Sequence, residues 1–395
     1  MEHNVMIHNQ FGLLAVLMTV PALIFYLQRY APINRLYGIV PPLVFAYFLP
    51  TLLTFLNIIP PEAPVYSQIK KFVLPASLLL LTLAVDIRGI IRLGRKAVIM
   101  FLTGTLGIVI GGPISLLIWH KYLPEDIWKG MAALAGSWIG GGANFIAIGQ
   151  SVGTPDQMMG VMVVVDVLVA NILTGALLFL AGRYEAIDRR LKADNSAIIE
   201  LRDKVIAFQK STERVASTAD YMLMLAMAFG GAYLAFEIGN RLPEIGDIIS
   251  HSTWKIILIT SLGVIFSFTP VKSYEGVGAS KLGTVMLYLL IGVIGASADL
   301  KQVIQYPALF LMGITWISIH VGLMVLVMKL IKAPLFFVAV GSQANVGGAA
   351  SAPIVASAFH PALASVGVML GIAGYVLGTY MALVCAYFLK IVAGI

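Results

Sequence analysis

The sequence predicts an all-α polytopic membrane protein made of two inverted repeats of five transmembrane helices, each with a Gly-rich re-entrant hairpin or broken helix. Three observations predict this fold: the apolar composition, a Gly-rich segment that occurs twice, and the distribution of Lys and Arg. Of 395 residues, 59% are hydrophobic and 11% are charged, whereas a soluble domain carries about 25% charged residues. The net charge is +7. We expect the Lys and Arg residues behind it to lie in loops that orient the chain in a bilayer, and not to bind nucleic acid.

Twelve apolar runs follow one another, and several reach the roughly 20 residues that cross a bilayer core. The first half contains six of them, at about 10–28, 36–57, 72–87, 97–119, 128–150 and 156–182. The second half contains the others, at about 219–240, 253–270, 281–298, 303–328, 333–358 and 361–390. A polar segment, 183–218, joins the halves.

The same Gly-rich pattern occurs once in each half. The sequence GSWIGGGAN at 136–144 matches GSQANVGGA at 341–349, which lies 205 residues later. A Ser and, four residues on, a Pro follow each copy. Gly-interrupted apolar segments at corresponding positions of two halves are a sequence sign of the binding site of a secondary transporter.

Basic residues decide between two topologies. If all twelve runs cross the membrane, the cytoplasmic loops hold 9 of the 26 Lys and Arg residues. If the two Gly-rich runs instead enter and return on one side, the cytoplasmic loops hold 18 of the 26. Cytoplasmic loops are normally rich in Lys and Arg, so we expect two hairpins, a cytoplasmic linker and both termini outside. Each half then makes five crossings, and the odd number inverts the second half. A broken helix that crosses the membrane stays an alternative, because about 25 residues also suffice to span.

The Gly-rich breaks predict a binding site. A break leaves backbone N–H and C=O groups without their helical partners. Within a membrane such groups are tolerated only where they are buried in protein or line a polar cavity. Freed N–H groups suit an anion, and carbonyl and amide oxygens suit Na⁺. The predicted substrate-binding residues are Ser137, Gly141, Gly142, Asn144, Ser342, Gln343, Gly347, Gly348 and Ser351. The alternative is that glycine serves only close helix packing, as we expect for Gly104, Gly107 and Gly111 and for Gly367, Gly371, Gly374 and Gly378.

Asp166 lies near the middle of the run 156–182. Acidic residues inside a membrane span are costly and mark functional sites, so we expect Asp166 to bind Na⁺ or to exchange protons; a structural hydrogen bond is the alternative. The predicted ion-binding residues are Asn144, Asp166, Asn171 and Asn345. His320 is either a packed neutral histidine or a proton-linked one.

The linker 183–218 places Ile187, Leu191 and later apolar residues at helical spacing. This pattern is typical of an amphipathic helix on the membrane surface or on a partner subunit, and a solvated connector is the alternative. The chain shows no phosphate loop, metal-ligand cluster or nucleophile motif, so we expect neither an enzyme nor a cofactor other than Na⁺ as the coupling ion. Cys385 is the single cysteine, which excludes an intramolecular disulfide.

The predicted domains follow from the position of the hairpins. Residues 1–71 form the first scaffold part, and 72–182 the first transport part with the hairpin 128–152. After the linker, 219–275 form the second scaffold part and 276–395 the second transport part with the hairpin 333–358.

The segment 136–173, with GSWIGGGAN and the downstream VDVLVAN, resembles the YjcL-like bacterial and chloroplast integral membrane family, a domain of unknown function. The resemblance extends over nearly the whole chain. That family is related to the sodium/glutamate symporters, the 2-hydroxycarboxylate transporters and the bile-acid and Na⁺/H⁺ exchanger-like fold. The resemblance implies a dimeric scaffold and a transport domain that carries both hairpins in an elevator movement. The glutamate symporters have a histidine in the Gly-rich tip, where this chain has Asn144.

We therefore expect a Na⁺-coupled symporter of a small organic anion or an amino acid, located in the inner (cytoplasmic) membrane. A Na⁺/H⁺ or other cation antiporter, and an H⁺-coupled symporter or exporter, are the alternatives. The expected partners are a small-molecule substrate, the lipid bilayer and a second copy of the chain in a homodimer, with no nucleic acid.

Overall fold

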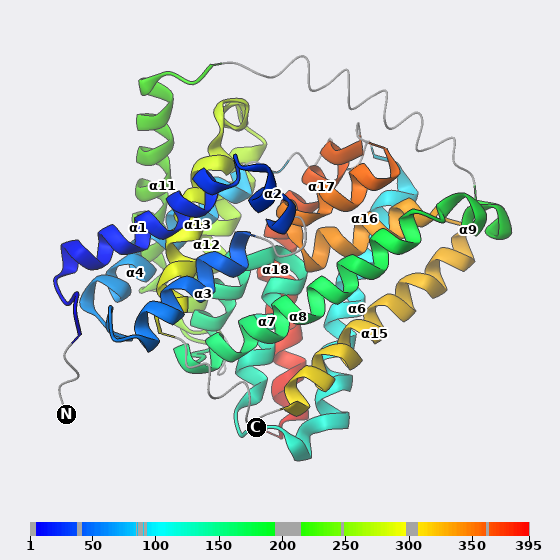
Figure 1. Cartoon of the computed structure of the whole chain (residues 1–395), viewed down its shortest axis with the longest axis horizontal. Coiled ribbons are helices and arrows are strands. Elements are labelled where there is room, and N and C mark those ends of the chain that lie inside the picture. Colours follow the sequence, from blue (N-terminus) through cyan, green and yellow to red (C-terminus); the bar gives the residue numbers. More distant parts are fainter. Residues whose placement is uncertain are drawn as a thin grey trace.

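The structure is a computed structural model that describes residues 5–37, 42–83, 85, 90, 93–193, 215–245, 249–297, 307–360 and 363–394. Within these residues every regular element is a helix (Figure 1). The first half contains α1 (Gln10–Leu27), α2 (Ala31–Tyr37), α3 (Pro42–Phe55), α4 (Pro64–Leu83), α6 (Arg95–Trp119), η1 (His120–Tyr122), α7 (Ile127–Ser151), α8 (Asp156–Ala181) and α9 (Tyr184–Leu191). The second contains α11 (Thr218–Gly239), α12 (His251–Ser267), η2 (Pro270–Val277), α13 (Ala279–Ala296), α15 (Pro307–Ile331), α16 (Leu335–Val346), α17 (Gly348–Phe359) and α18 (Ala364–Val392). The predicted all-α fold is confirmed.

The chain is a polytopic membrane protein. In the described part, eight helices are long and apolar enough to cross a membrane by length and composition alone, including α7, which is broken at Gly141. There are nine if α12 and η2, bent by 94° relative to each other, form one span. Large apolar side chains point outward from these helices; Ile172 on α8 is 53% exposed and Phe179 is 60% exposed. Such exposure suits a lipid-facing surface, because a soluble monomer seldom exposes apolar patches of this extent.

The helices pack in two groups. Helix group A consists of α1, α3, α4, α11, α12 and α13, with α13 between α3 and α4 and the α11–α12 pair against α4. Helix group B consists of α6, α7, α8, α15, α16, α17 and α18, and α18 lies at its centre against α6, α7, α16 and α17. The two groups meet mainly where α4, α12 and α13 touch α7, α8 and α18.

Two helices pack differently from the predicted domain division. The sequence placed 72–83 and 279–296 with the hairpins, but α4 and α13 pack mainly with the helices of group A. In addition, α4 begins at Pro64, eight residues before the apolar run, because Lys70 and Lys71 interrupt the hydrophobic pattern but do not interrupt the helix. The division into a static and a moving part stays a prediction.

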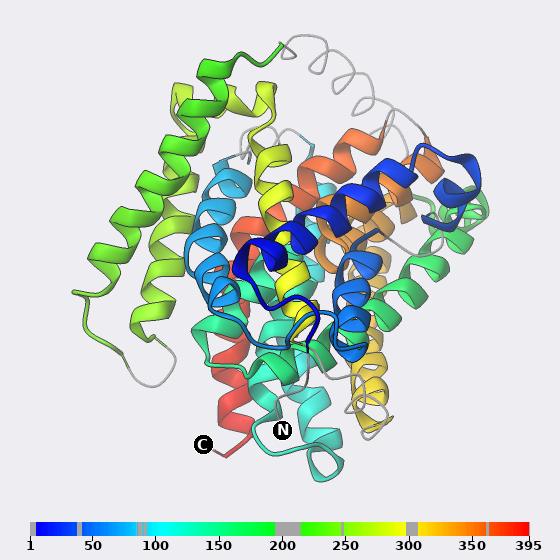
Figure 2. The ribbon, with the colours of Figure 1, turned by 60° about the vertical axis from the view of Figure 1, so that its left-hand side comes forward.

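The chain ends and the flanks of the linker lie on opposite sides. In Figures 1 and 2 both termini are at the lower side, whereas α9 and the first turn of α11 are at the upper side. This arrangement agrees with an odd number of crossings in each half. The inverted repeat itself, and the assignment of the upper side to the cytoplasm, stay predictions.

The described part of the linker contains α9, which docks on the body of the protein. Asp188 is 2% exposed, and its Oδ1 accepts a 2.8 Å hydrogen bond from the backbone N–H of Leu335 at the start of α16. Tyr184 packs against Phe359 with ring centroids 5.5 Å apart. The first turn of the linker is therefore a packed helix and not a solvated connector, while the predicted apolar positions from 198 to 208 lie outside the described residues.

Candidate functional site

The first Gly-rich segment is a re-entrant hairpin, which we call hairpin 1 (α7). Its helix breaks at Gly141, where φ is 72° and ψ is −174°, a region that only glycine occupies at low cost. The two arms touch: a Cβ placed on Gly149 would lie 3.4 Å from the Cβ of Ala133. An uninterrupted helix would separate these residues by about 24 Å, so the second arm returns along the first.

The base of hairpin 1 confirms this geometry. Thr154 Oγ1 donates a 3.0 Å hydrogen bond to the backbone oxygen of Lys129, near the start of the first arm. Gly153 has a φ of 67°, which ends the returning arm in the left-handed conformation typical of helix ends. Pro155 then precedes the first turn of α8. The chain thus leaves the hairpin on the side where it entered.

The second Gly-rich segment is also re-entrant; we call it hairpin 2 (α16 and α17). The break lies at Gly347 and Gly348, and Gly348 has a φ of 60°. Gln343 Nε2 donates a 2.8 Å hydrogen bond across the break to Ser351 Oγ. These residues are eight positions apart, about 12 Å along a straight helix, so α17 folds back against α16. A continuous broken helix, the alternative for both segments, does not describe this structure.

The two hairpin tips meet. A Cβ on Gly348 would lie 3.8 Å from the Cα of Gly141, and a Cβ on Gly141 would lie 3.7 Å from the Tyr375 ring. In Figures 1 and 2 hairpin 2 (orange) lies in the upper part of the molecule and hairpin 1 (teal) in the lower part. They therefore approach the contact from opposite sides. The sequence-based expectation that the tips come together is confirmed.

The glycine stripes of α6 and α18 serve close packing, as expected. A Cβ on Gly374 would meet the backbone oxygens of Ile139 and Ala344, one on each hairpin, at 2.7 and 3.3 Å. A Cβ on Gly107 would lie 2.9 Å from the Cα of His320. At these positions α18 reaches the backbones of both hairpins, and α6 reaches the backbone of α15, only because the glycines lack side chains.

Asn144 and Asn345 hold the hairpins to these helices. Asn144 Nδ2 donates to the oxygens of Gly140 and Tyr375 at 3.1 and 2.9 Å, and its Oδ1 accepts from Thr379 at 2.7 Å. Both asparagines are fully buried.

The contacts of Asn345 follow the same plan. Its Nδ2 donates to the oxygens of Gly341 and Phe101 at 2.8 and 3.1 Å, and its Oδ1 accepts from Thr105 at 2.8 Å. Each carboxamide thus forms one bond within its own hairpin and two bonds to a neighbouring helix. The two partners on that helix are a backbone carbonyl and a threonine hydroxyl one turn apart. This favours a structural role for both, while their predicted ion-binding role stays a prediction.

Asp166 bonds the first arm of hairpin 1. Its Oδ2 accepts a 2.5 Å hydrogen bond from Ser137, and its Oδ1 accepts a 2.8 Å bond from Trp138 Nε1. Trp138 packs edge-to-face on Trp316, with ring centroids 5.0 Å apart. No ion pair joins Asp166 to a Lys, Arg or His of the described chain. Two neutral donors leave lone pairs on the carboxylate, which retains the capacity to hold a cation.

His320 bonds the entering arm of hairpin 2. Its Nδ1 lies 2.9 Å from the oxygen of Gly104, and its Nε2 lies 2.8 Å from Ser342 Oγ. Because a carbonyl can only accept, Nδ1 carries a proton, and in the neutral ring Nε2 accepts from Ser342. The predicted substrate ligand Ser342 is therefore engaged by His320.

An unsatisfied polar atom lies beside the hairpin tips. Gln343 is 1% exposed, and its Oε1 has no hydrogen-bond partner among the described residues. The orientation of the carboxamide follows from its neighbour: Thr174 donates to the oxygen of Ala170 at 2.8 Å, so it accepts from Gln343 Nε2 at 2.9 Å. A buried acceptor without a partner costs about 1–3 kcal/mol, which a cation or a ligand donor at this position would recover.

Asn171 lies one helical turn before Thr174 on α8. Its side chain is half-buried, and no hydrogen bond joins it to another described residue. The predicted residues that the structure brings together at the tips are Gly141, Gln343, Gly347, Gly348 and Ser351, and Thr174 of α8 borders them through its bond to Gln343. Gly142 faces away, toward Leu287 and Ile291 of α13. The described residues contain no group of three or more His, Cys, Asp or Glu side chains that could hold a metal ion.

Comparison with known proteins places the chain in a family. The family model "Protein of unknown function (DUF819)" matches residues 15–392. The chain belongs to this family. It is also similar to the "Uncharacterized membrane protein YjcL" of Bacillus subtilis (strain 168), with 27% identity over 345 residues, which cover 83% of this chain and 84% of that protein. The resemblance to a YjcL-like membrane family is confirmed.

Sequence reasoning missed four polar partners in this DUF819 protein: Thr105, Thr174, Tyr375 and Thr379. Thr174 could have been found, since it lies three residues after Asn171 on the same helix face of an apolar run. Thr105 and Thr379 contact residues more than 200 positions away. A single threonine in an apolar helix also bonds its own backbone, so it gives no separate signal.

Proposed function

We propose that this DUF819 protein is a secondary active transporter, a Na⁺-coupled symporter of a small organic anion or amino acid. One observation carries the proposal: two re-entrant tips meet in the interior of a membrane protein, next to a buried acceptor, Gln343 Oε1, that lacks a partner. Backbone breaks within a membrane persist where they are buried in protein or line a polar path. Paired breaks at the contact of two halves are the plan of transporter sites.

The site supports the two ligands in different ways. The start of α17 at Gly348 offers backbone N–H groups with partial positive charge to an anionic group of the substrate. Gln343 Oε1 and Ser351 Oγ at the tips are hard oxygen atoms, which suit Na⁺. The carboxylate of Asp166, eight residues before Thr174 on α8 and bonded to the first arm of hairpin 1, is a separate candidate oxygen ligand. The cation is a transported substrate in this proposal, and no resident cofactor or catalytic step is needed.

An elevator-type movement of group B along group A is part of the proposal. Several polar contacts join the groups among the described residues. They include the ion pair of Lys70 with Asp156 at 2.6 Å, the contact of Ser261 with Tyr380 at 2.8 Å, the bond of Tyr47 to the oxygen of Gly160, those of Ser250 and Thr253 to the oxygen of Ser151, and the contact of Thr260 with Thr379. Contacts of this kind can be exchanged as helices slide. Cysteines at Ser261 and Tyr380, cross-linked by a short bifunctional reagent, should stop uptake reversibly; unimpaired uptake by the cross-linked protein contradicts the movement. We also propose a homodimer in the inner membrane, following the resemblance.

A thermal-shift screen tests the proposed function. Purified protein is heated with amino acids and organic acids, each in Na⁺ and in K⁺. A ligand of the folded state raises the melting temperature by mass action, so we expect at least one compound to stabilise the protein only with Na⁺. Uptake of that compound into proteoliposomes must then follow an imposed Na⁺ gradient. If hits are equal in Na⁺ and K⁺ and uptake follows a pH gradient, coupling is to protons, which the contact of His320 with Ser342 favours.

A further inference from the structure

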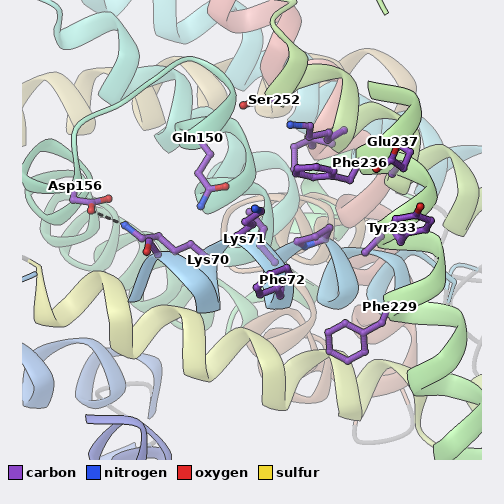
Figure 3. A pocket seen from close by; sticks show the side chains of 17 residues that line it. Lys70, Lys71, Phe72, Gln150, Asp156, Phe229, Tyr233, Phe236, Glu237 and Ser252 are labelled. Atoms are coloured by element: carbon purple, nitrogen blue, oxygen red, sulfur yellow. Dashed lines mark hydrogen bonds and ion pairs between the residues drawn. The ribbon is translucent and has the colours of Figure 1, made fainter. Parts of the chain in front are cut away.

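A second site lies away from the hairpin tips, in a crevice of about 570 Å³ between α4, α11 and α12 of group A and the start of α8 and end of α7 in group B (Figure 3). The inner face of α11 packs closely on α4 beside the crevice, since a Cβ on Gly231 of α11 would meet the side chain of Leu79 of α4. In the predicted topology this crevice is on the outer side of the membrane.

One wall of the crevice is apolar and aromatic. Phe229, Tyr233 and Phe236 line it from one face of α11, and Phe72 lines it from α4. Their side chains remain open to the surroundings; Phe72 is 53% and Tyr233 is 63% exposed. Since α11 is a candidate membrane span, this wall faces the lipid and suits an acyl chain.

The other end of the crevice is cationic. Lys71 and Lys255 both lie over the Phe236 ring, with their Nζ atoms 5.2 and 4.2 Å from its centroid. Neither ammonium forms an ion pair with a carboxylate of the described chain. The two acidic residues of the lining have other partners: Asp156 pairs with Lys70 at 2.6 Å, and Glu237 pairs with Arg241 at 3.4 Å.

Two like charges that share one ring repel each other, and an anion between them would relieve that repulsion. The amide of Gln150 and the hydroxyl of Ser252 also belong to the lining and can donate hydrogen bonds to such an anion. Figure 3 shows Lys71 and Gln150 directed into the same space. Three of the eight Lys and Arg residues predicted outside, Lys70, Lys71 and Lys255, gather here, against the tendency of basic residues to stay inside.

We propose that this crevice binds an anionic phospholipid of the outer leaflet, with its phosphate between Lys71 and Lys255 and an acyl chain along Phe72, Phe229 and Tyr233. The combination of two uncompensated cations with an aromatic wall open to lipid matches an anion that carries an apolar tail, and a small soluble anion would leave the wall without a partner. The assignment of this site does not rest on the proposed transport function. Because its lining comes from both helix groups, a bound lipid contacts both.

Titration of the purified full-length protein with phosphatidylglycerol, followed by native mass spectrometry, tests the site. We expect Lys71→Gln/Lys255→Gln to weaken phosphatidylglycerol binding on the order of 10- to 30-fold, from about 1 kcal/mol per basic residue near a lipid surface. The matched control Lys121→Gln/Lys129→Gln removes two charges from the same predicted side outside the crevice and should leave binding unchanged. Tyr233→Ala should weaken binding of the long-chain lipid more than that of its dihexanoyl analogue.

Three outcomes would overturn the assignment. The first is equal binding of phosphatidylglycerol and the zwitterionic phosphatidylcholine. The second is equal loss of binding in the crevice and control variants. The third is displacement of phosphatidylglycerol by millimolar inorganic phosphate alone, which would identify a site for a soluble anion. Melting temperatures of all variants, measured without lipid, show whether each variant is folded, so that loss of binding is read only from folded protein.

Discussion

Gln343 of hairpin 2 and Thr174 of α8 are joined by a 2.9 Å hydrogen bond in which the carboxamide is the donor. This bond directs Gln343 Nε2 toward α8 and leaves Gln343 Oε1 buried without a partner. A protein that only needed to pack this position would be more stable with an apolar side chain, because an unsatisfied buried acceptor is unfavourable. The orientation therefore supports the proposed ligand site at the hairpin tips.

The first prediction is that Gln343→Leu stays folded but loses ligand binding. Leucine of similar size removes the unsatisfied oxygen, a gain of about 1–3 kcal/mol, and also the bonds to Thr174 and Ser351, a loss of about 0.6 kcal/mol each. The melting temperature without ligand should therefore stay close to that of the wild type or rise slightly. The apparent affinity for the Na⁺-dependent ligand, measured from the thermal shift, should fall at least about tenfold, because one hydrogen bond to a charged group is lost. Gln10→Leu, at an exposed glutamine of α1, is the matched control. Normal ligand stabilisation of Gln343→Leu would exclude Gln343 from the site.

The sequence predicted much of this arrangement because the relevant signals are local or repeated. Glycine runs in apolar segments and the distribution of basic residues predicted both hairpins, and the repeated motif predicted that their tips meet. The packing of α4 with group A was not predicted, since Lys70 and Lys71 resemble a loop in a hydropathy pattern although their long side chains can extend from a helix toward the membrane surface. The partners of Asn144 and Asn345 were not predicted either, because a tertiary hydrogen bond leaves no period in the sequence.

The second prediction separates structural asparagines from one that is open to a ligand. Asn345→Ala removes three buried hydrogen bonds, and Asn144→Ala removes the same number. At about 0.6 kcal/mol for each bond within a membrane protein, each variant should lose about 2 kcal/mol and melt at a lower temperature with or without Na⁺. Asn171→Ala removes no bond to a described residue and should melt as the wild type does. An Asn345→Ala protein that keeps its melting temperature but loses its response to Na⁺ would instead show that Asn345 binds the ion.

The third prediction concerns the backbone of hairpin 1. Gly141 has a φ of 72°, yet a Cβ there would meet only ordinary van der Waals contact. Gly141→Ala should therefore act through backbone strain of about 1–3 kcal/mol and reduce folded yield or uptake. Gly175→Ala on α8, where a Cβ would have open space at a helical φ, is the control and should be neutral. If both variants behaved like the wild type, the hairpin would not require the left-handed break.

The fourth prediction is that Lys192 faces the cytoplasm and Arg241 faces outside. The basis is the excess of Lys and Arg in the loops on the linker side. Single cysteines replace each residue in a Cys385→Ala background; Cys385 is itself buried. An impermeant thiol reagent on intact cells should label the cysteine at 241 and not the one at 192. The reverse labelling would invert the topology and place the lysine-lined crevice on the cytoplasmic side.

The last prediction concerns Asp166, whose carboxylate accepts bonds from Ser137 and Trp138 and has no cationic partner in the described chain. A charged carboxylate in a membrane interior is costly unless a cation accompanies it, and in the proposed symporter Na⁺ supplies that charge. Asp166→Asn keeps an oxygen that can accept from Trp138, so the protein should fold. It loses the negative charge, so the Na⁺ concentration for half-maximal uptake should rise about tenfold, the equivalent of about 1.4 kcal/mol.

Ser137→Ala is the matched variant for Asp166→Asn, because it removes one donor to the carboxylate and keeps the charge. It should change the Na⁺ dependence far less than Asp166→Asn does. Uptake of labelled substrate into proteoliposomes, with Na⁺ and pH varied independently, distinguishes the roles. Loss of pH dependence in Asp166→Asn, with little effect of Na⁺ before or after the change, would make Asp166 a proton carrier. Unchanged uptake in a folded Asp166→Asn protein would show that Asp166 only holds the first arm of hairpin 1 to α8. Ion coupling would then depend on the oxygen atoms at the hairpin tips.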